Sequence, residues 1–493
     1  MMLGPFFLLI PLLLSLSGGL AVGLIPALHA RKVSRIWTGV FVTLTSVCML
    51  FAAWKMAGVE LLLWQMTPSL PIFLKLDGLS RFFLGLVAVT WVLTAFYAFA
   101  YMGHEQEEPR FYAFFLITQG VLSCLTMAGS LVTFYLFYEA MTLVTVPLVL
   151  HTRTREAIAA AIKYLVYSVF GASVALLGIF YLSHACETLS FLPGGSLRAE
   201  WLSGSANTLR WIAFGMILGF GTKAGMFPLH GWLPTAHPVA PAPASAVLSG
   251  VITKMGVLGV IRVVYYCIGV EPLQGTWVQI AWMILALITV FMGSMLALKE
   301  NVFKKRLAYS SVSQVSYILF ALSTMDKTGF QGALLHVLFH SAIKITLFMT
   351  AGAVICLTGL TQVSDLRGIG KRMPLLMCLF TVVSLGLIGI PPTGGFVSKW
   401  YIATGAMNLP NAFAFIGPAV LLVSAILTAA YLLTITIQGF FPGRDTTEAS
   451  LSPITVPKRM VVPMLLLSFL VLAGGMFPDR LLIFFQRIAE TIL

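Results

Sequence analysis

Long apolar runs separated by short polar breaks extend over almost the whole chain. Runs of about 20 residues have the length that an α-helix needs to cross a hydrocarbon core of about 30 Å. The short alternating segments of a membrane β-barrel are not seen, so the pattern predicts an all-α polytopic membrane protein. We predict about fourteen transmembrane helices, near residues 2–28, 36–57, 79–102, 111–128, 130–150, 157–183, 208–228, 243–269, 275–298, 306–324, 328–358, 374–398, 412–440 and 460–477.

Two of these predicted helices are interrupted by proline and glycine. The first break runs from Met226 to Pro243 and the second from Gly389 to Gly395. Irregular backbone survives at membrane depth only where it is buried in protein or lines a cavity, and paired broken helices are typical of inverted-repeat transporters. We therefore expect two inverted five-helix repeats. The predicted regions are 1–110 for helices 1–3, 111–270 for the first repeat (helices 4–8), 271–440 for the second (helices 9–13), and 441–493 for a cytoplasmic loop, helix 14 and the tail.

Composition agrees with a membrane location. The chain is 59% hydrophobic and 10% charged, which is too little charge to cover the surface of a soluble protein. The first apolar run is longer than the core of a secretory signal and lacks a basic start, so we expect it to be the first helix. At 479–490 apolar and charged residues mix, and this tail is expected to form a short amphipathic helix on the membrane surface.

The net charge of +13 is explained by topology rather than by nucleic acid. Basic residues gather in the loops after odd-numbered helices, which predicts an inner cell membrane protein with both termini on the non-cytoplasmic side. The six cysteines are scattered without CxxC spacing, which argues against a metal cluster, a haem or a disulfide framework. We expect no cofactor and no redox centre in this chain.

Ionisable residues within or beside the apolar segments are the candidates for function: Glu139, Lys163, Lys223, Lys254, Lys344 and Lys399. A charge in a bilayer costs at least a few kcal/mol on insertion scales, so such residues usually face protein or water and mark ion or proton paths. Glu139 and Lys223 suit a proton switch, although a static buried ion pair fits equally well. Lys254, deep in its helix, favours function, whereas Lys163 and Arg262 are placed to snorkel toward an interface.

Histidines add a second set of candidates. His336, His340 and Lys344 recur every four residues on one helix face and predict a proton wire, with a polar seam between helices as the alternative. His-x3-His can hold zinc, but no further ligand is evident nearby, so we expect no metal. His230 and His237 lie within the first break and are expected to bond backbone carbonyls freed there.

Residues 223–256 then show a long ordered motif, with Lys223-Ala224-Gly225-Met226-Phe227-Pro228 leading through His230, Pro234 and His237 to Lys254-Met255-Gly256. This motif closely resembles the signature of the antiporter-like subunits shared by respiratory complex I, Mrp-type multisubunit sodium/proton antiporters and membrane-bound hydrogenases. Further matches are Asp77-Gly78-Leu79-Ser80, Phe137-Tyr138-Glu139, 305–314, His336 to Lys344, and Gly389 to Lys399.

The resemblance implies a fourteen-helix subunit with two half-channels joined by charged and polar residues. Position by position, Glu139 and Lys223 match the family's gating pair, Lys254 its central lysine, His336 and His340 its connecting histidines, and Lys399 its terminal lysine. Members work inside larger complexes with sister antiporter-like subunits or redox modules, and none carries the redox centre. Length and the lysine at position 399 look most like the smaller Mrp subunit or a hydrogenase subunit.

The leading hypothesis is therefore a proton-translocating subunit of a multisubunit complex, with protons alone or sodium and protons as cargo. Its partners would be other membrane subunits, among them sister antiporter-like subunits, with a hydrogenase or iron-sulfur module as one option for the driving enzyme. A self-sufficient cation/proton or solute transporter is the alternative. A structural scaffold is the least favoured, because unpaired buried cations stabilise a bundle poorly.

Overall fold

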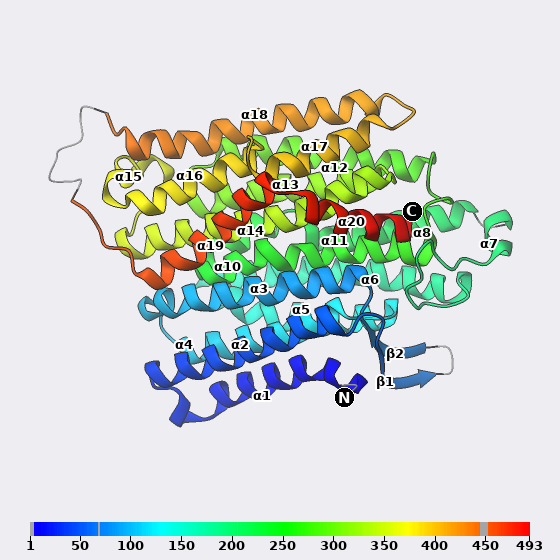
Figure 1. Ribbon diagram of the computed structural model, residues 1–493, viewed down its shortest axis with the longest axis horizontal. Helices are drawn as coiled ribbons and strands as arrows, with labels where there is room; N and C mark the ends of the chain where they lie inside the picture. Colours follow the sequence, from blue (N-terminus) through cyan, green and yellow to red (C-terminus); the bar gives the residue numbers. More distant parts are fainter. Residues whose placement is uncertain (1–3, 68–69, 205, 444–451) are drawn as a thin grey trace.

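The computed structural model describes residues 4–67, 70–204, 206–443 and 452–493. Most of this part is α-helical, and the long helices run side by side along one direction (Figure 1). The long helices are α1 Ile10–Leu24, α2 Arg31–Lys55, α3 Gly78–Tyr101, α4 Glu108–Thr126, α5 Leu131–Val149, α6 Arg155–Ala185, α8 Ala206–Ala224, α12 Trp277–Lys299, α13 Phe303–Ser323, α14 Lys327–Thr358, α16 Pro374–Ile388, α18 Phe413–Phe440 and α19 Lys458–Met476. The predominantly helical, multi-pass membrane architecture predicted from the sequence is confirmed.

Ten helical segments of the described part are long and apolar enough to cross a bilayer. The other predicted intervals also contain helices, namely α4, α8, α13 and α16. These are shorter or more polar; α13, for example, begins with three cations in a row, Lys304, Lys305 and Arg306. The count of fourteen membrane crossings therefore stays a prediction.

Shorter elements complete the fold. They are α7 Ala199–Gly204, α9 Leu233–Val239, α10 Ala242–Val247, α11 Thr253–Ile261, α15 Ile369–Arg372, α17 Gly394–Met407 and α20 Asp479–Ile492. Two strands, β1 Glu60–Thr67 and β2 Leu70–Lys75, pair antiparallel and were not predicted. Isolated bridges at Leu74–Ala128, Ser130–Ser190 and Cys186–Leu197 tie this hairpin and the 186–197 segment to the ends of α4 and α5.

Helix α14 is the centre of the bundle. Its 32 residues give a length of about 48 Å at 1.5 Å per residue. It packs against α10, α13, α16, α17, α19 and α20, and most of its residues from Gly329 to Val354 are buried. A helix buried on all sides can expose polar groups only to other protein groups, so the polar residues of α14 face other helices.

Both termini lie at one end of the bundle, and α15, the end of α18 and the start of α19 lie at the other (Figure 1). The tail forms the expected amphipathic helix, α20, and its place on the membrane surface stays a prediction. Phe485, Ile488, Ala489 and Ile492 are buried, and the ring of Phe485 packs edge-on against Phe82 at 4.8 Å. The apolar face of α20 is therefore used against α3 and α14 rather than left to lipid.

Arg262 forms a buried ion pair near the end of the bundle where the termini lie. The prediction that it snorkels toward water is wrong. Arg262 is 1% exposed, and its guanidinium donates to both carboxylate oxygens of Asp77 and to Ser80 Oγ (2.8 Å). Asp77 is also the N-cap of α3 and accepts from the backbone N–H of Ser80 at 2.7 Å. One carboxylate thus connects the start of α3 to the last turns of the 253–268 helix.

Breaking this pair is expected to destabilise the bundle strongly. Arg262→Gln leaves a buried carboxylate without its cation, a change that costs about 3–5 kcal/mol in comparable buried pairs. Unfolding of the purified chain in mixed micelles measures the loss, with the exposed Arg480→Gln as the matched control. Equal unfolding free energies for the two variants would contradict this account.

Candidate functional site

The first break places Lys223 at a helix end. Helix α8 stops at Ala224, Gly225 adopts a left-handed conformation (φ +81°), and the chain turns before α9 begins at Leu233. The buried Lys223 ammonium donates to Thr142 Oγ1 (2.9 Å), Tyr164 OH (3.0 Å) and Ser168 Oγ (2.8 Å), which lie on α5 and α6. Three hydroxyl oxygens therefore hold this cation.

Glu139 lies one turn before Thr142 on α5, but its carboxylate is not bonded to Lys223. It is partly exposed and accepts a long hydrogen bond from Tyr135 OH (3.4 Å). Its neighbours Leu136 and Leu143 are exposed on the same helix, and no ion pair joins Glu139 to a cation of the described residues. The gating pair stays a prediction.

The accessory candidates Lys163, His230 and His237 lie in two different places. Lys163 lies beside the first break, near Gly231, and the ring of His230 stacks on Phe227 at 6.0 Å. His237 is fully buried against Phe348, with 4.6 Å between ring centroids. Neither ring nitrogen of His237, nor Nδ1 of His230, has a hydrogen-bond partner in the described chain. The prediction that these two histidines bond freed carbonyls is therefore wrong for His237 and unsupported at Nδ1 of His230.

Lys304, rather than His230 or His237, bonds backbone carbonyls freed at the first break. Its buried ammonium donates to the carbonyl oxygens of Ala240 (2.6 Å) and Pro238 (3.3 Å) at the end of the first break. The predicted helix at 306–324 places Lys304 in the preceding loop. The signal that was missed is helical spacing. Lys304, Leu307, Ser311 and Gln314 follow one another at three- and four-residue steps and so lie on one face of α13. Three of these four residues are polar, and all four are buried.

Lys254 follows an irregular stretch of helix. Residues Leu248–Ile252 form a π-helical segment, and such segments are frequent at functional sites. The carbonyl oxygen of Ser249 accepts hydrogen bonds from the Lys254 ammonium and from Thr253 Oγ1 (2.8 Å). The local widening of the helix therefore supplies a backbone acceptor to a fully buried cation.

The polar face of α14 has the composition that the sequence predicted. The rings of His336 and His340 stack with centroids 5.6 Å apart, and His336 Nδ1 lies 2.9 Å from Ser398 Oγ. One turn further on, the Lys344 ammonium donates to the Leu307 carbonyl (3.0 Å) and to the Ser310 hydroxyl. His336 Nε2 and both ring nitrogens of His340 have no partner in the part of the chain that the structure describes.

Lys399 lies across the second break. Helix α16 ends at Ile388, Gly389 is left-handed (φ +92°), and α17 starts at Gly394. The Lys399 ammonium donates to the carbonyl oxygens of Leu387 (2.6 Å) and Ile388 (3.1 Å) and lies 4.8 Å above the Tyr317 ring. Lys399 thus follows its break whereas Lys223 precedes its own, so the two lysines are not placed alike.

Hydroxyl groups connect these residues into one series. Ser249 and Ser311 share a hydrogen bond of 2.7 Å, Ser311 Oγ donates to the Leu307 carbonyl (3.0 Å), and that carbonyl also accepts from Lys344. At the other end of the series, the ring of Tyr317, which lies under the Lys399 ammonium, stacks on His336 at 5.7 Å. We call Lys254, Lys344, His340, His336 and Lys399 the buried row.

The described residues place no carboxylate on the buried row. The ion pairs of the described chain involve Arg31, Arg35, Lys75, Arg262 and Lys305. The three lysines of the buried row are instead held by carbonyl and hydroxyl oxygens. A positive charge on any of them lies in the bundle interior, where it is costly. A multi-pass membrane protein with such a row has the form of an ion- or proton-conducting subunit.

Comparison with known proteins gives the same class. Residues 128–428 match the family model described as NADH:quinone oxidoreductase/Mrp antiporter, TM. The chain is 33% identical to the NADH-quinone oxidoreductase subunit N of Desulforudis audaxviator over 84% of each chain. It is 30% identical to hydrogenase-4 component B of Escherichia coli, over 80% of this chain and 61% of that protein.

A solved structure supports the fold. A chain in the structure of the Mrp complex from Dietzia aligns with a TM-score of 0.85 and 22% identity, over 100% of this chain and 98% of that one. The chain belongs to the NADH:quinone oxidoreductase/Mrp antiporter transmembrane family, the antiporter-like subunits. The family resemblance seen in the sequence is confirmed, and the relatives come from the same three kinds of complex.

Close packing around the second break generates a prediction. A Cβ added at Gly395 would overlap the carbonyl oxygen of Gly386, whereas one added at Gly85 on α3 meets no atom within 4 Å. Gly395→Ala is expected to force α16 and α17 apart and to cost about 1–3 kcal/mol or more, as overpacking does. Gly85→Ala is the control. Thermal unfolding in detergent checks both, and equal stability would mean that the break is not tightly packed.

Proposed function

We propose that this chain is a proton-translocating antiporter-like subunit of a multisubunit membrane complex, and that the buried row is its central proton path. The observation that carries the proposal is the set of three lysines on the row, two fully buried and Lys399 partly buried, which have no carboxylate partner in the described chain and lie among histidine rings and serine hydroxyls. A structural ion pair would need an opposite charge, and a packing role would favour apolar side chains.

The residues divide into roles by what they touch. Lys254, Lys344 and Lys399 hold protons at Nζ. His340 lies within reach of the charges of all three, and its unpartnered ring nitrogens are free to accept and release protons through water. Ser398 holds the His336 ring by its Nδ1 atom, which leaves Nε2 as the exchanging atom.

Lys223 and Glu139 form the proposed gate. The three hydroxyls around Lys223 keep the ammonium in place without neutralising it, so a movement of the Glu139 carboxylate toward it would change its charge balance strongly. Lys163, His230 and His237 are accessory candidates near the first break. Two inverted repeats, fourteen membrane crossings and termini on the non-cytoplasmic side are part of this proposal.

The partners follow from the family. The relatives named above are a subunit of an NADH-quinone oxidoreductase and a component of a hydrogenase, and the structural neighbour lies in an Mrp complex. We propose that this chain works with other membrane subunits, and that sodium as well as protons is moved if its complex is of the Mrp kind. Affinity purification in gentle detergent distinguishes the options: hydrogenase-like or iron-sulfur subunits indicate a redox-driven pump, and small hydrophobic subunits alone indicate an antiporter.

If the buried row is the proton path, a substitution in it should lower transport without lowering stability. Lys254→Met replaces a buried unpaired cation by an apolar side chain of similar length, so stability is expected to stay unchanged or to rise. Proton transport by the native complex in liposomes is expected to fall about a hundredfold, the low end of what proton transfer by a positioned side chain contributes.

The matched control is Lys458→Met, an exposed lysine at the start of α19. Glu139→Gln is tested beside it as the gate variant. Unchanged transport in both Lys254→Met and Glu139→Gln would contradict the proposal. Loss of assembly without a separate transport defect would favour a scaffold, and transport by the isolated chain alone would favour a self-sufficient transporter.

A further inference from the structure

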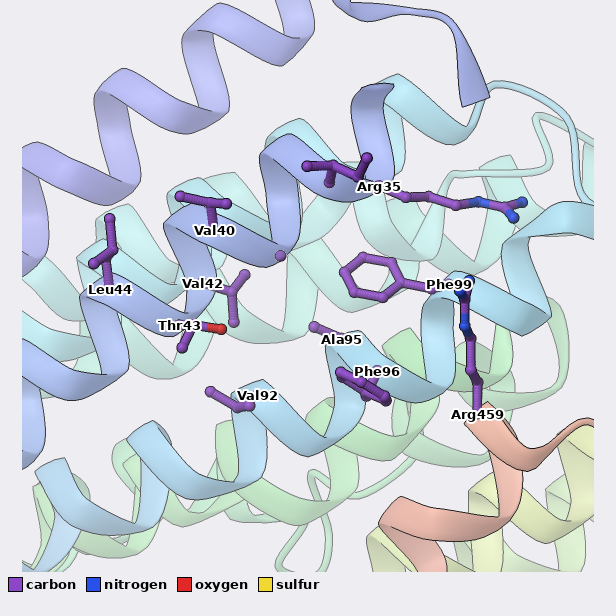
Figure 2. Close-up of a pocket in the computed structure, with 12 residues that line it drawn as sticks. Arg35, Val40, Val42, Thr43, Leu44, Val92, Ala95, Phe96, Phe99 and Arg459 are labelled. Carbon is purple, nitrogen blue, oxygen red and sulfur yellow. The ribbon is translucent and has the colours of Figure 1, made fainter. Parts of the chain in front are cut away.

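A groove of about 550 Å³ lies between α2 and α3, a size in the range of ordinary ligand pockets (Figure 2). Its walls are mainly apolar and include Val40, Leu44, Val92, Ala95 and Phe96. It lies on the N-terminal side of the bundle, away from the buried row. Aliphatic and aromatic walls of this kind suit a hydrocarbon chain.

One end of the groove is cationic. Figure 2 shows Arg35 and Arg459 together at this end, beside the ring of Phe99. Arg459 stands in the first turn of α19, where the helix dipole disfavours a cation. It is exposed and forms no hydrogen bond or ion pair with the residues that the structure describes. An exposed and unpaired guanidinium at this position can bind an anion that the chain itself does not supply.

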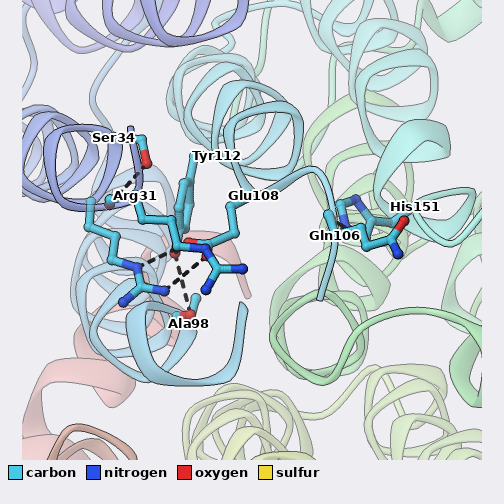
Figure 3. A network of polar contacts seen from close by, with 8 residues as sticks. Arg31, Ser34, Ala98, Gln106, Glu108, Tyr112 and His151 are labelled. Carbon is cyan, nitrogen blue, oxygen red and sulfur yellow. Dashed lines mark hydrogen bonds and ion pairs between the residues drawn. The ribbon is translucent and has the colours of Figure 1, made fainter. Parts of the chain in front are cut away.

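Arg35 belongs to a small network that carries excess positive charge. The buried carboxylate of Glu108 accepts from Arg35 Nε (3.0 Å) and Nη2 (2.9 Å) and also pairs with Arg31 Nε at 3.2 Å (Figure 3). Glu108 thus pairs with both Arg31 and Arg35, whereas Arg459 has no ion-pair partner in the described part of the chain. These four residues, three cations and one carboxylate, carry a net charge of +2, and two of their cations, Arg35 and Arg459, line the mouth of the apolar groove.

We propose that this groove binds one anionic phospholipid, with its phosphate on Arg459 and the outer edge of Arg35 and one acyl chain along α2. Guanidinium groups bind phosphate by paired, charge-assisted hydrogen bonds, and basic pockets between membrane helices bind anionic lipid headgroups. From Arg35 to Leu44 the groove follows nine residues of helix, or about 14 Å, close to half of a hydrocarbon core of about 30 Å.

The predicted topology places this end in the cytoplasmic leaflet. Arg35 and Arg459 belong to the basic loops that follow odd-numbered helices, and the cytoplasmic leaflet carries anionic lipids. The charge at the mouth therefore selects an anionic lipid over a zwitterionic one. This site is independent of proton movement through the buried row.

The experiment uses the full chain in its native complex, stripped of lipid and then exposed to vesicles of equal parts phosphatidylglycerol and phosphatidylcholine. Native mass spectrometry counts the lipids retained. We expect a preference for phosphatidylglycerol that falls about fivefold in Arg459→Gln, since one cation near a charged headgroup is worth about that factor. The exposed Arg480→Gln is the matched control and should keep the preference.

A second variant tests the groove itself. Thr43→Trp places a large ring on the groove wall and should abolish retention of both lipids, whereas Val47→Trp, on an exposed position of α2 outside the groove, should not. Unchanged preference in Arg459→Gln, or unchanged retention in Thr43→Trp, would overturn the proposal. So would full displacement of the lipid by inorganic phosphate, or a neighbouring subunit cross-linked to Thr43→Cys in the native complex.

Discussion

Backbone carbonyls that lose their helical partners inside the bundle need donors, and in this chain lysine side chains supply them. Unsatisfied polar groups cost several kcal/mol in a medium without water. Four lysines, three of them buried and Lys399 partly buried, donate to carbonyl oxygens, and three of the four do so at interrupted or widened helices: Lys254 to Ser249, Lys344 to Leu307, Lys399 to Leu387 and Ile388, and Lys304 to Pro238 and Ala240. The broken helices and the buried cations therefore stabilise each other.

This arrangement explains how the bundle holds charge without ion pairs on the row. A carbonyl dipole attracts an ammonium less strongly than a carboxylate does, so the lysine is positioned without being fixed in the charged form. The interior remains sensitive to any charge that approaches it. Arg262 shows the contrast, since its bidentate pair with Asp77 fixes both groups and joins α3 to its neighbour. The structure thus separates a cation fixed in an ion pair from cations held by neutral carbonyl and hydroxyl oxygens.

Sequence spacing predicted the helices, both breaks and the polar face of α14, because helical periodicity and proline act locally. It did not predict which neighbouring helix covers a given face. Glu139 and Lys223 are the right residue types on the expected helices, yet Lys223 is surrounded by hydroxyls from α5 and α6, and Glu139 is partly exposed and bonded to Tyr135. Lys304 looked like a loop cation because the start of α13 cannot be located to within one turn from a run of basic residues. The carbonyls that the lysines meet belong to backbone irregularities that have no direct signature in sequence.

The most direct test of the central claim is a high-resolution electron cryomicroscopy map of the chain in its native complex, examined for ordered water along the buried row. The account predicts waters at about 2.7–3.2 Å from His340 and from His336 Nε2, bridging these rings to Lys344 and Lys399. A dry row, with apolar side chains sealed between the histidines and the lysines, would contradict a proton path along it.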